Sequence, residues 1–149
     1  NALHLPIASE SLDVVAFSSV LHHIDDREAA LCEARRVLKP GGMVFAFDPN
    51  LLHPAMALFR HPRSPLYSSQ GVSPNEKPLY PSELRKSFEA AGLVVIAQRC
   101  QADIPYRHVA PKILNALLAV YNIGDRVMAL SGLDRWFGSF VLTAARKVS

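Results

Sequence analysis

The sequence predicts an open α/β fold, and its first third carries the two observations behind this prediction. Residues 11–17 are apolar and β-branched on both faces, which is typical of a strand buried within a parallel sheet. A helical pattern follows and ends at a tight turn, after which residues 43–47 form a second apolar segment. Strand, helix and strand in this order predict a right-handed parallel βαβ unit.

The helix between these two strands begins near Asp25 or Asp26 and runs to about Leu38. Either aspartate can cap the first turn, and Glu28 follows Asp25 at the spacing of a capping box. Lysine, proline and two glycines occupy residues 39–42. Because proline cannot continue a helix and glycine supplies turn geometry, this run ends the helix abruptly.

A long irregular segment separates this unit from the next helix. Residues 50–80 hold many prolines and are predicted to be an insertion with one short helix over residues 53–59. A helix then begins at Pro81 and is closed by Gly92, and residues 93–97 form a third strand.

The last third of the chain is predicted to hold two helices and a final strand. A broad apolar face over residues 113–121 belongs to a helix that begins at Pro111 and ends near Gly124. Asp125 is expected to cap a short helix that reaches residue 130, and residues 138–145 form the last strand.

Composition excludes several classes of protein. The chain has 149 residues, of which 50% are hydrophobic and 19% charged, so it is not disordered and forms one domain or part of one. A net charge of +3 is too weak to argue for nucleic acid, and the most apolar stretch, residues 116–120, is too short to cross a membrane. Two cysteines, Cys32 and Cys100, are expected to be buried and inert, and their scarcity fits a reducing, cytoplasmic location.

Ligands of open α/β sheets bind beyond the carboxyl ends of the strands, which directs attention to residues 18–23 and 48–50. His22 and Asp48 are weak candidates for catalysis, His22 as a general base. Asp48 either contacts substrate or binds a proton, or it only forms an Asp-Pro turn. No metal site is expected, because adjacent residues of a regular helix cannot both face one ion and no third ligand has matching spacing for His22 and His23.

Four motifs, taken together, carry a resemblance to a known family. They are the run Asn1-Ala2-Leu3-His4-Leu5-Pro6-Ile7, then Leu12-Asp13-Val14-Val15, Leu21-His22-His23, and Arg36-Val37-Leu38-Lys39-Pro40-Gly41-Gly42. In this order and spacing they resemble the class I S-adenosylmethionine-dependent methyltransferases, in particular the methyltransferase type 11 group.

The resemblance implies a Rossmann-like sheet in which this chain contributes strands four to seven, the last of them antiparallel. It also implies S-adenosylmethionine as cofactor, with Asn1 and Ala2 beside the adenine, although Asn1 replaces the family's usual aspartate. Residues past strand four match those that line the methionine end of the cofactor, namely Ser18, Ser19, Leu21 and His22.

The family's glycine-rich cofactor loop and its acidic ribose-binding residue have no counterpart in this sequence. Gly41-Gly42 is not that loop, since it follows a helix and precedes a strand. The sequence opens almost at once into a strand, so we expect it to represent the carboxyl-terminal part of a methyltransferase domain, a part that is inactive by itself.

The function that follows from the resemblance is methyl transfer to a small-molecule acceptor. Residues 50–80 and 101–136 are expected to form an acceptor-side insertion and a lid, with Tyr67 and Tyr80 either lining the acceptor pocket or only packing the insertion. Basic residues of the insertion either meet an anionic acceptor or form a solvated loop: Arg60, His61 and Arg63.

A different class of function remains open beside this one. The chain is alternatively a non-catalytic half-domain or an interaction module that binds no cofactor alone. Without strands one to three, strand four would be an apolar sheet edge, and such an edge favours self-association.

Overall fold

The computed structural model describes residues 2–69, 72–73, 75–102, 115–116 and 118–148. Its strands are β1 (Leu12–Ser18), β2 (Leu38–Pro49), β3 (Val94–Gln101) and β4 (Phe140–Arg146). Its helices are α1 (Arg27–Val37), α2 (Pro54–Arg60), α3 (Pro81–Ala90), α4 (Leu118–Ser131) and α5 (Asp134–Phe137), and a 3-10 turn, η1, covers Leu21–His23. Within the described residues, no helix has the length and apolar character that a membrane span requires.

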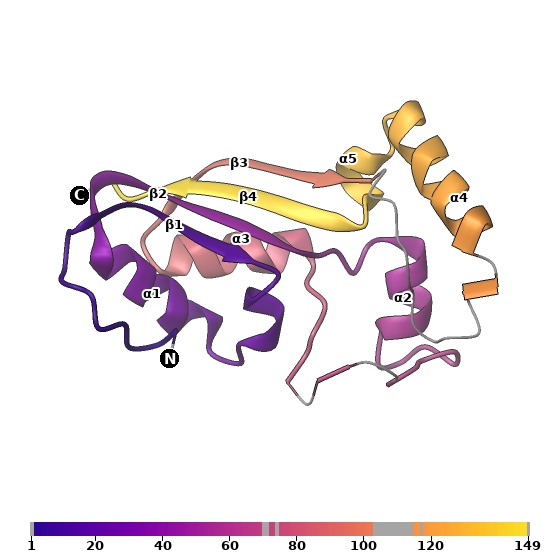
Figure 1. Ribbon diagram of the computed structural model, residues 1–149, viewed down its shortest axis with the longest axis horizontal. Coiled ribbons are helices and arrows are strands. Elements are labelled where there is room, and N and C mark those ends of the chain that lie inside the picture. The colour runs from indigo at the N-terminus through magenta and orange to yellow at the C-terminus, as the bar shows by residue number, and fades with distance from the viewer. Residues whose placement is uncertain (1, 70–71, 74, 103–114, 117, 149) are drawn as a thin grey trace.

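The sheet has the order β1-β2-β4-β3 (Figure 1). β1 and β2 are parallel, as the βαβ prediction requires, and β4 runs antiparallel to both β2 and β3. The predicted α/β fold with an antiparallel last strand is therefore confirmed.

Helices α1 and α3 lie together on one face of the sheet (Figure 1). Their apolar sides and the inner faces of the strands form the core, whose largest fully buried members include Leu31, Leu84, Phe88 and Val141. The opposite face carries exposed apolar side chains, among them Val14, Phe45 and Ile96. The prediction that residues 11–17 are buried on both faces is therefore wrong, because β1 is an edge strand and among the described residues helices cover only one side of it.

The start of α1 distinguishes between the two candidate caps. The Asp26 side chain accepts a hydrogen bond from the Ala29 amide at 2.9 Å, so Asp26 is the N-cap. Asp25 instead pairs with Lys77 at 3.0 Å, so the proposed capping box of Asp25 and Glu28 does not form.

The turn after α1 lies inside β2 rather than before it. Leu12 pairs with Leu38 and Val14 with Met43, so residues 39–42 form a wide irregularity opposite Asp13. Gly41 has a φ of +80°, a left-handed conformation that glycine adopts without strain.

The carboxyl-terminal third differs from prediction in two respects. α4 continues through Gly124 and buries Asp125 in its middle, so Asp125 does not begin a second helix. The second difference is the short helix α5, which was not predicted. In the first third of the chain, Cys32 is exposed where a buried thiol was expected. The predicted helix start at Pro111 lies outside the described residues.

Candidate functional site

The site begins where the chain leaves β1. Ser19 has a φ of 55°, a left-handed conformation uncommon for a residue other than glycine, and its amide donates to the Phe47 carbonyl oxygen at 2.7 Å. This turn sends the chain directly into η1, which places His22 above the carboxyl end of β2. The Leu21 side chain is fully buried in the core and thereby holds this turn against the sheet.

His22 and Asp48 are in direct contact. The His22 Nδ1 lies 2.8 Å from the Asp48 Oδ1, and the His22 backbone amide donates to the same oxygen at 3.1 Å. An ionised carboxylate can only accept hydrogen bonds, so the His22 Nδ1 is the donor and carries the proton of the imidazole. The free lone pair of the ring is then on Nε2. The sequence singled out both residues separately, and the fold brings them together.

The second oxygen of Asp48 has no hydrogen-bond partner among the residues that the structure describes. Asp48 is fully buried and its Oδ2 is unsatisfied. Since an unpaired buried acceptor costs free energy, it marks Asp48 as a group arranged for more than packing.

The other predicted cofactor residues differ in what they expose. Ser18 and Ser19 present exposed side chains at the end of β1, whereas Leu21 and His22 are buried. Ala2 is half-buried in the loop before β1, and Asn1 lies outside the described residues. The exposed Ser18 and Ser19 hydroxyls lie near the buried His22 and Asp48. Hydroxyl groups suit the polar methionine end of S-adenosylmethionine, so the described residues fit one side of such a cofactor.

The loop that holds Ala2 is fixed to α1 through a charged pair. The Leu5 amide donates to Glu33 at 2.8 Å, and the Arg36 guanidinium donates both to Glu33 and to the Ile7 carbonyl oxygen. The hydrogen bonds from Arg36 and from the Leu5 amide lower the pKa of the Glu33 carboxyl to about 2.

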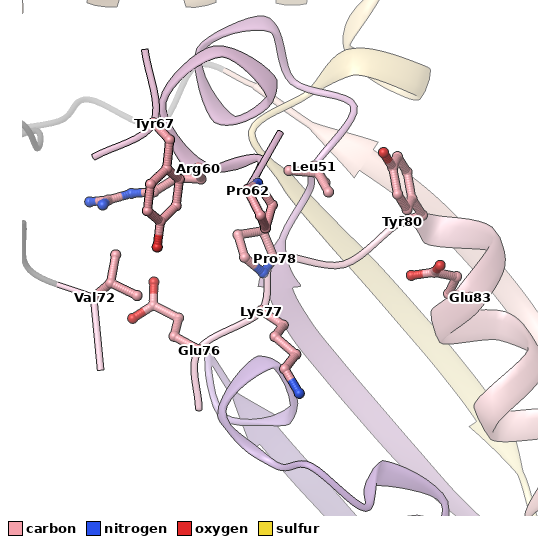
Figure 2. Close-up of a pocket in the computed structure, with 10 residues that line it drawn as sticks. All are labelled: Leu51, Arg60, Pro62, Tyr67, Val72, Glu76, Lys77, Pro78, Tyr80 and Glu83. Carbon is pink, nitrogen blue, oxygen red and sulfur yellow. The ribbon is translucent and has the colours of Figure 1, made fainter. Parts of the chain in front are cut away.

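A pocket of about 250 Å³ opens between the insertion and the start of α3 (Figure 2). Its walls are largely apolar, and Figure 2 shows the Tyr67 hydroxyl and the Glu76 carboxylate pointing toward one another across it. Ten residues line it: Leu51, Arg60, Pro62, Tyr67, Val72, Glu76, Lys77, Pro78, Tyr80 and Glu83.

Three of the five insertion residues named from the sequence line this pocket. Tyr67, Tyr80 and Arg60 are on its wall, and the Arg60 guanidinium is oriented by a 2.6 Å hydrogen bond to the Ser68 carbonyl oxygen. His61 and Arg63 do not line the pocket. Instead, the His61 ring accepts a hydrogen bond from the Arg63 amide in a local turn.

The pocket adjoins His22 through the backbone. The Lys77 amide donates to the His22 carbonyl oxygen at 2.8 Å, so one wall of the pocket is attached to η1. Residues at the end of β2 complete this connection, because the Leu51 amide donates to Leu79 and the Leu79 amide to Pro49.

Two buried polar groups near the site had no individual role predicted from the sequence, although Asn50 lies within the range 48–50 that the sequence singled out. The Asn50 amide nitrogen donates to the carbonyl oxygens of Gly138 and Trp136 and thereby ties the end of β2 to α5. His53 approaches Asp125 at 3.4 Å and links α2 to α4. The sequence feature that would have singled out Asn50 is an Asx-type turn directly after a strand. No feature of the sequence predicts the contact between His53 and Asp125.

The buried cysteine is not a reactive group. Burial, with a smaller contribution from the charge of Asp134, raises the pKa of the Cys100 thiol to about 11. Cys100 is therefore a neutral thiol at physiological pH, as its predicted inert role requires.

Comparisons with known proteins agree on one family. A family model described as a methyltransferase domain matches residues 1–46. A ubiquinone biosynthesis O-methyltransferase of Sinorhizobium fredii is 31% identical over 90 residues, which is 59% of this chain and 36% of that protein. The chain thus spans little more than a third of the length of this relative.

Solved structures agree with the fold. A methyltransferase in complex with the Haloferax volcanii Trm112 methyltransferase activator superposes with a TM-score of 0.67 at 23% identity, covering 100% of this chain and 60% of that one. A SAM-dependent methyltransferase of Thermotoga maritima gives 0.64 at 19% identity, covering 98% and 61%. The resemblance drawn from the four sequence motifs is confirmed.

Proposed function

Because this chain is a relative of the class I S-adenosylmethionine-dependent methyltransferases, we propose that it takes part in methyl transfer to a hydroxyl oxygen of a small, planar, largely apolar acceptor. The observation that carries this proposal is the pocket between the insertion and α3, whose wall is hydrogen-bonded to η1 through Lys77 and His22. The acceptor would therefore lie next to the carboxyl ends of β1 and β2, where ligands of such sheets bind.

The lining of the pocket supports an aromatic acceptor. Tyr67 and Tyr80 offer ring faces, and Pro62, Pro78 and Leu51 supply apolar surface. Arg60 and Glu76 add polar groups that would orient a hydroxyl or carboxyl substituent. The O-methyltransferase relative supports oxygen as the methylated atom.

We assign the cofactor side to the residues that the sequence motifs named. Ser18 and Ser19 would bind the methionine end of S-adenosylmethionine, and Leu21 and His22 would support it from below. Asn1 and Ala2 would lie beside the adenine. The rest of the cofactor site would come from residues outside this sequence, which fits the share of its relative that the chain covers.

When bound, S-adenosylmethionine supplies an electrophilic methyl group on a sulfonium. The protein's part is to align the acceptor oxygen with that methyl, and alignment accounts for most of the acceleration in reactions of this kind. The acceptor hydroxyl loses its proton as the new bond forms. His22 is the candidate to receive it, since Asp48 keeps the Nε2 lone pair available.

A radiolabelled methyl-transfer assay with catechol-type acceptors tests this proposal. It is made with the longest natural form of the protein that contains these residues. Tyr67→Ala should raise the KM for the acceptor several-fold with less effect on kcat, because it removes a pocket wall. Leu66→Ala is the matched control, since Leu66 is a neighbouring exposed side chain outside the pocket. Equal KM values for the two variants would contradict the assignment of the pocket.

Calorimetric titration with S-adenosylhomocysteine separates the enzyme from the non-catalytic alternative. Saturable binding supports the cofactor assignment. Absence of both binding and methyl transfer in the longest natural form would instead support the interaction module. Cytoplasmic location is part of the proposal, supported by the low cysteine content, and fractionation of cells tests it.

A further inference from the structure

We propose that His22, His23 and Glu76 form a binding site for a divalent transition-metal ion of the zinc and cobalt class. The proposal does not depend on methyl transfer. A metal bound at His22 Nε2 takes the lone pair that the proposed function gives to the acceptor proton, so these two roles of His22 exclude one another. It rests on three side chains that the sequence analysis did not combine, because Glu76 lies in the insertion, far along the chain from the two histidines.

The three side chains converge on one point. Each offers one ligand atom, and these atoms all lie within 4.8 Å of one another. The ring centroids of His22 and His23 are 3.9 Å apart and tilted by 41°, an arrangement that the tight 3-10 turn permits and a regular helix does not. Ligands of a tetrahedral zinc ion lie roughly 3.3 Å apart, given metal–nitrogen bonds of about 2.0 Å, so the ligand atoms must approach one another by up to about 1.5 Å when the ion binds.

Hydrogen bonds already orient both imidazoles for this role. The His22 Nδ1 donates to Asp48 at 2.8 Å, and the His23 Nδ1 lies 2.8 Å from the Ser73 hydroxyl oxygen. Because Nδ1 of each ring is engaged in these contacts, Nε2 would be the atom that binds the metal. Metal-binding histidines have this same arrangement, in which the second ring nitrogen donates to a carboxylate or another oxygen.

Glu76 is held in place without being neutralised. Its Oε2 accepts from the Ser73 amide at 3.2 Å, so Ser73 supports two of the three ligands. Lys77, the nearest lysine in sequence, pairs with Asp25, and Figure 2 shows its amine directed away from the Glu76 carboxylate. Among the described residues, Glu76 has no ion-pair partner.

The chemistry of the ligands selects the metal. Two neutral imidazoles and one carboxylate suit zinc, cobalt or iron, whereas magnesium and calcium prefer oxygen ligands throughout. Three protein ligands leave a fourth position open, as in catalytic zinc sites. Glu76 also lines the pocket, so that open position would be accessible from it.

Cobalt titration followed by visible absorbance tests the proposal directly, using the longest natural form of the protein that contains these residues and no methyl donor. We expect one Co²⁺ per chain, with d–d bands that Zn²⁺ abolishes on displacement. His23→Gln and Glu76→Gln should each weaken binding by about tenfold or more. The matched controls are His61→Gln and Glu89→Gln, which alter a histidine and a glutamate outside the cluster and should bind as the unmodified chain does.

A second variant distinguishes a metal site from fortuitous surface binding. Asp48→Asn leaves all three ligands in place but removes the carboxylate that orients His22, and it should weaken Co²⁺ binding about 10–100-fold. Far-UV circular dichroism checks that each variant is folded. Binding of equal affinity in His23→Gln, Glu76→Gln and the unmodified chain would overturn the proposal, as would the absence of d–d bands in the unmodified chain.

Discussion

The Nδ1 atom of His22 lies 2.8 Å from the Oδ1 atom of Asp48, and both side chains are buried. η1 supplies the histidine and β2 the carboxylate, so the contact connects the carboxyl ends of two parallel strands. Every role considered for His22, as a cofactor contact, a base or a ligand, depends on which ring nitrogen carries the proton.

Replacement of Asp48 by asparagine should change that tautomer. An amide in place of the carboxylate offers a donor as well as an acceptor, so it no longer fixes the proton on Nδ1. Nitrogen-15 NMR of the imidazole measures the tautomer directly: we expect the Nδ1–H form in the unmodified chain and a mixture in Asp48→Asn. His22→Gln assigns the His22 signals by their loss. An identical His22 spectrum in both proteins would contradict this reading.

The N-cap of α1 gives a matched pair of neighbouring aspartates. Asp26→Ala removes the hydrogen bond to the Ala29 amide and should lower the free energy of unfolding by about 1 kcal/mol. Asp25→Ala removes only an exposed ion pair with Lys77 and should change it by less than about 1 kcal/mol. Urea denaturation of both variants measures the difference, and a larger loss in Asp25→Ala would show that the cap is assigned to the wrong residue.

Two glycines should respond in opposite directions to the same substitution. A Cβ at Gly138 would lie 2.4 Å from the Gln101 backbone, so Gly138→Ala should destabilise the fold by about 1–3 kcal/mol through forced backbone movement. Gly124 lies inside α4 with nothing within 4 Å of its Cβ position, and Gly124→Ala should stabilise by up to about 1 kcal/mol. Thermal unfolding of the two variants compares them, and the same sign for both would be inconsistent with this packing.

Stability should fall in acid because of Glu33. Hydrogen bonds from Arg36 and the Leu5 amide lower the pKa of this carboxyl from 4.5 to about 2. Above pH 4.5 Glu33 is ionised in both the folded and the unfolded chain, and its contribution is fully present. As the pH falls from 4.5 toward 2, the unfolded chain binds the proton first, so this contribution is progressively lost.

Urea denaturation across that pH interval measures the effect. Glu33→Gln should remove part of the pH dependence, whereas Glu89→Gln, which alters an exposed pair with Arg85, should retain it. If both variants follow the unmodified chain throughout the interval, Glu33 is not the group responsible.

The free edge of β1 should make the chain self-associate when it is studied alone. Within the described part of the chain β1 pairs with β2 alone, and Val14 on its open face is 53% exposed. Ala16→Lys places a charge on this edge strand and should reduce self-association in light scattering. Leu130→Lys, on the exposed side of α4, is the control. If the unmodified chain stays monomeric at high concentration, the prediction is contradicted.

Local sequence patterns predicted the order and type of most helices and strands well, and the residues at which they begin and end less well. The start of α3 at Pro81 and its closure by Gly92 were correct, because proline and glycine act on their own backbone. α4 was divided in error at Gly124, since a glycine followed by an aspartate resembles a helix boundary. The helix continues there because Asp125 is buried beside His53 of the insertion.

The sequence by itself determined the α/β class, the succession of strands and helices and the family resemblance, and it directed attention to residues 18–22 and Asp48. These depend on periodicity and on motifs in which each residue affects its near neighbours. The tertiary structure alone decided that His22 pairs with Asp48, that Tyr67 and Tyr80 face one pocket, and that Glu76 joins the two histidines. Such contacts arise when distant segments pack against the same sheet edge, and no pattern within either segment specifies that meeting.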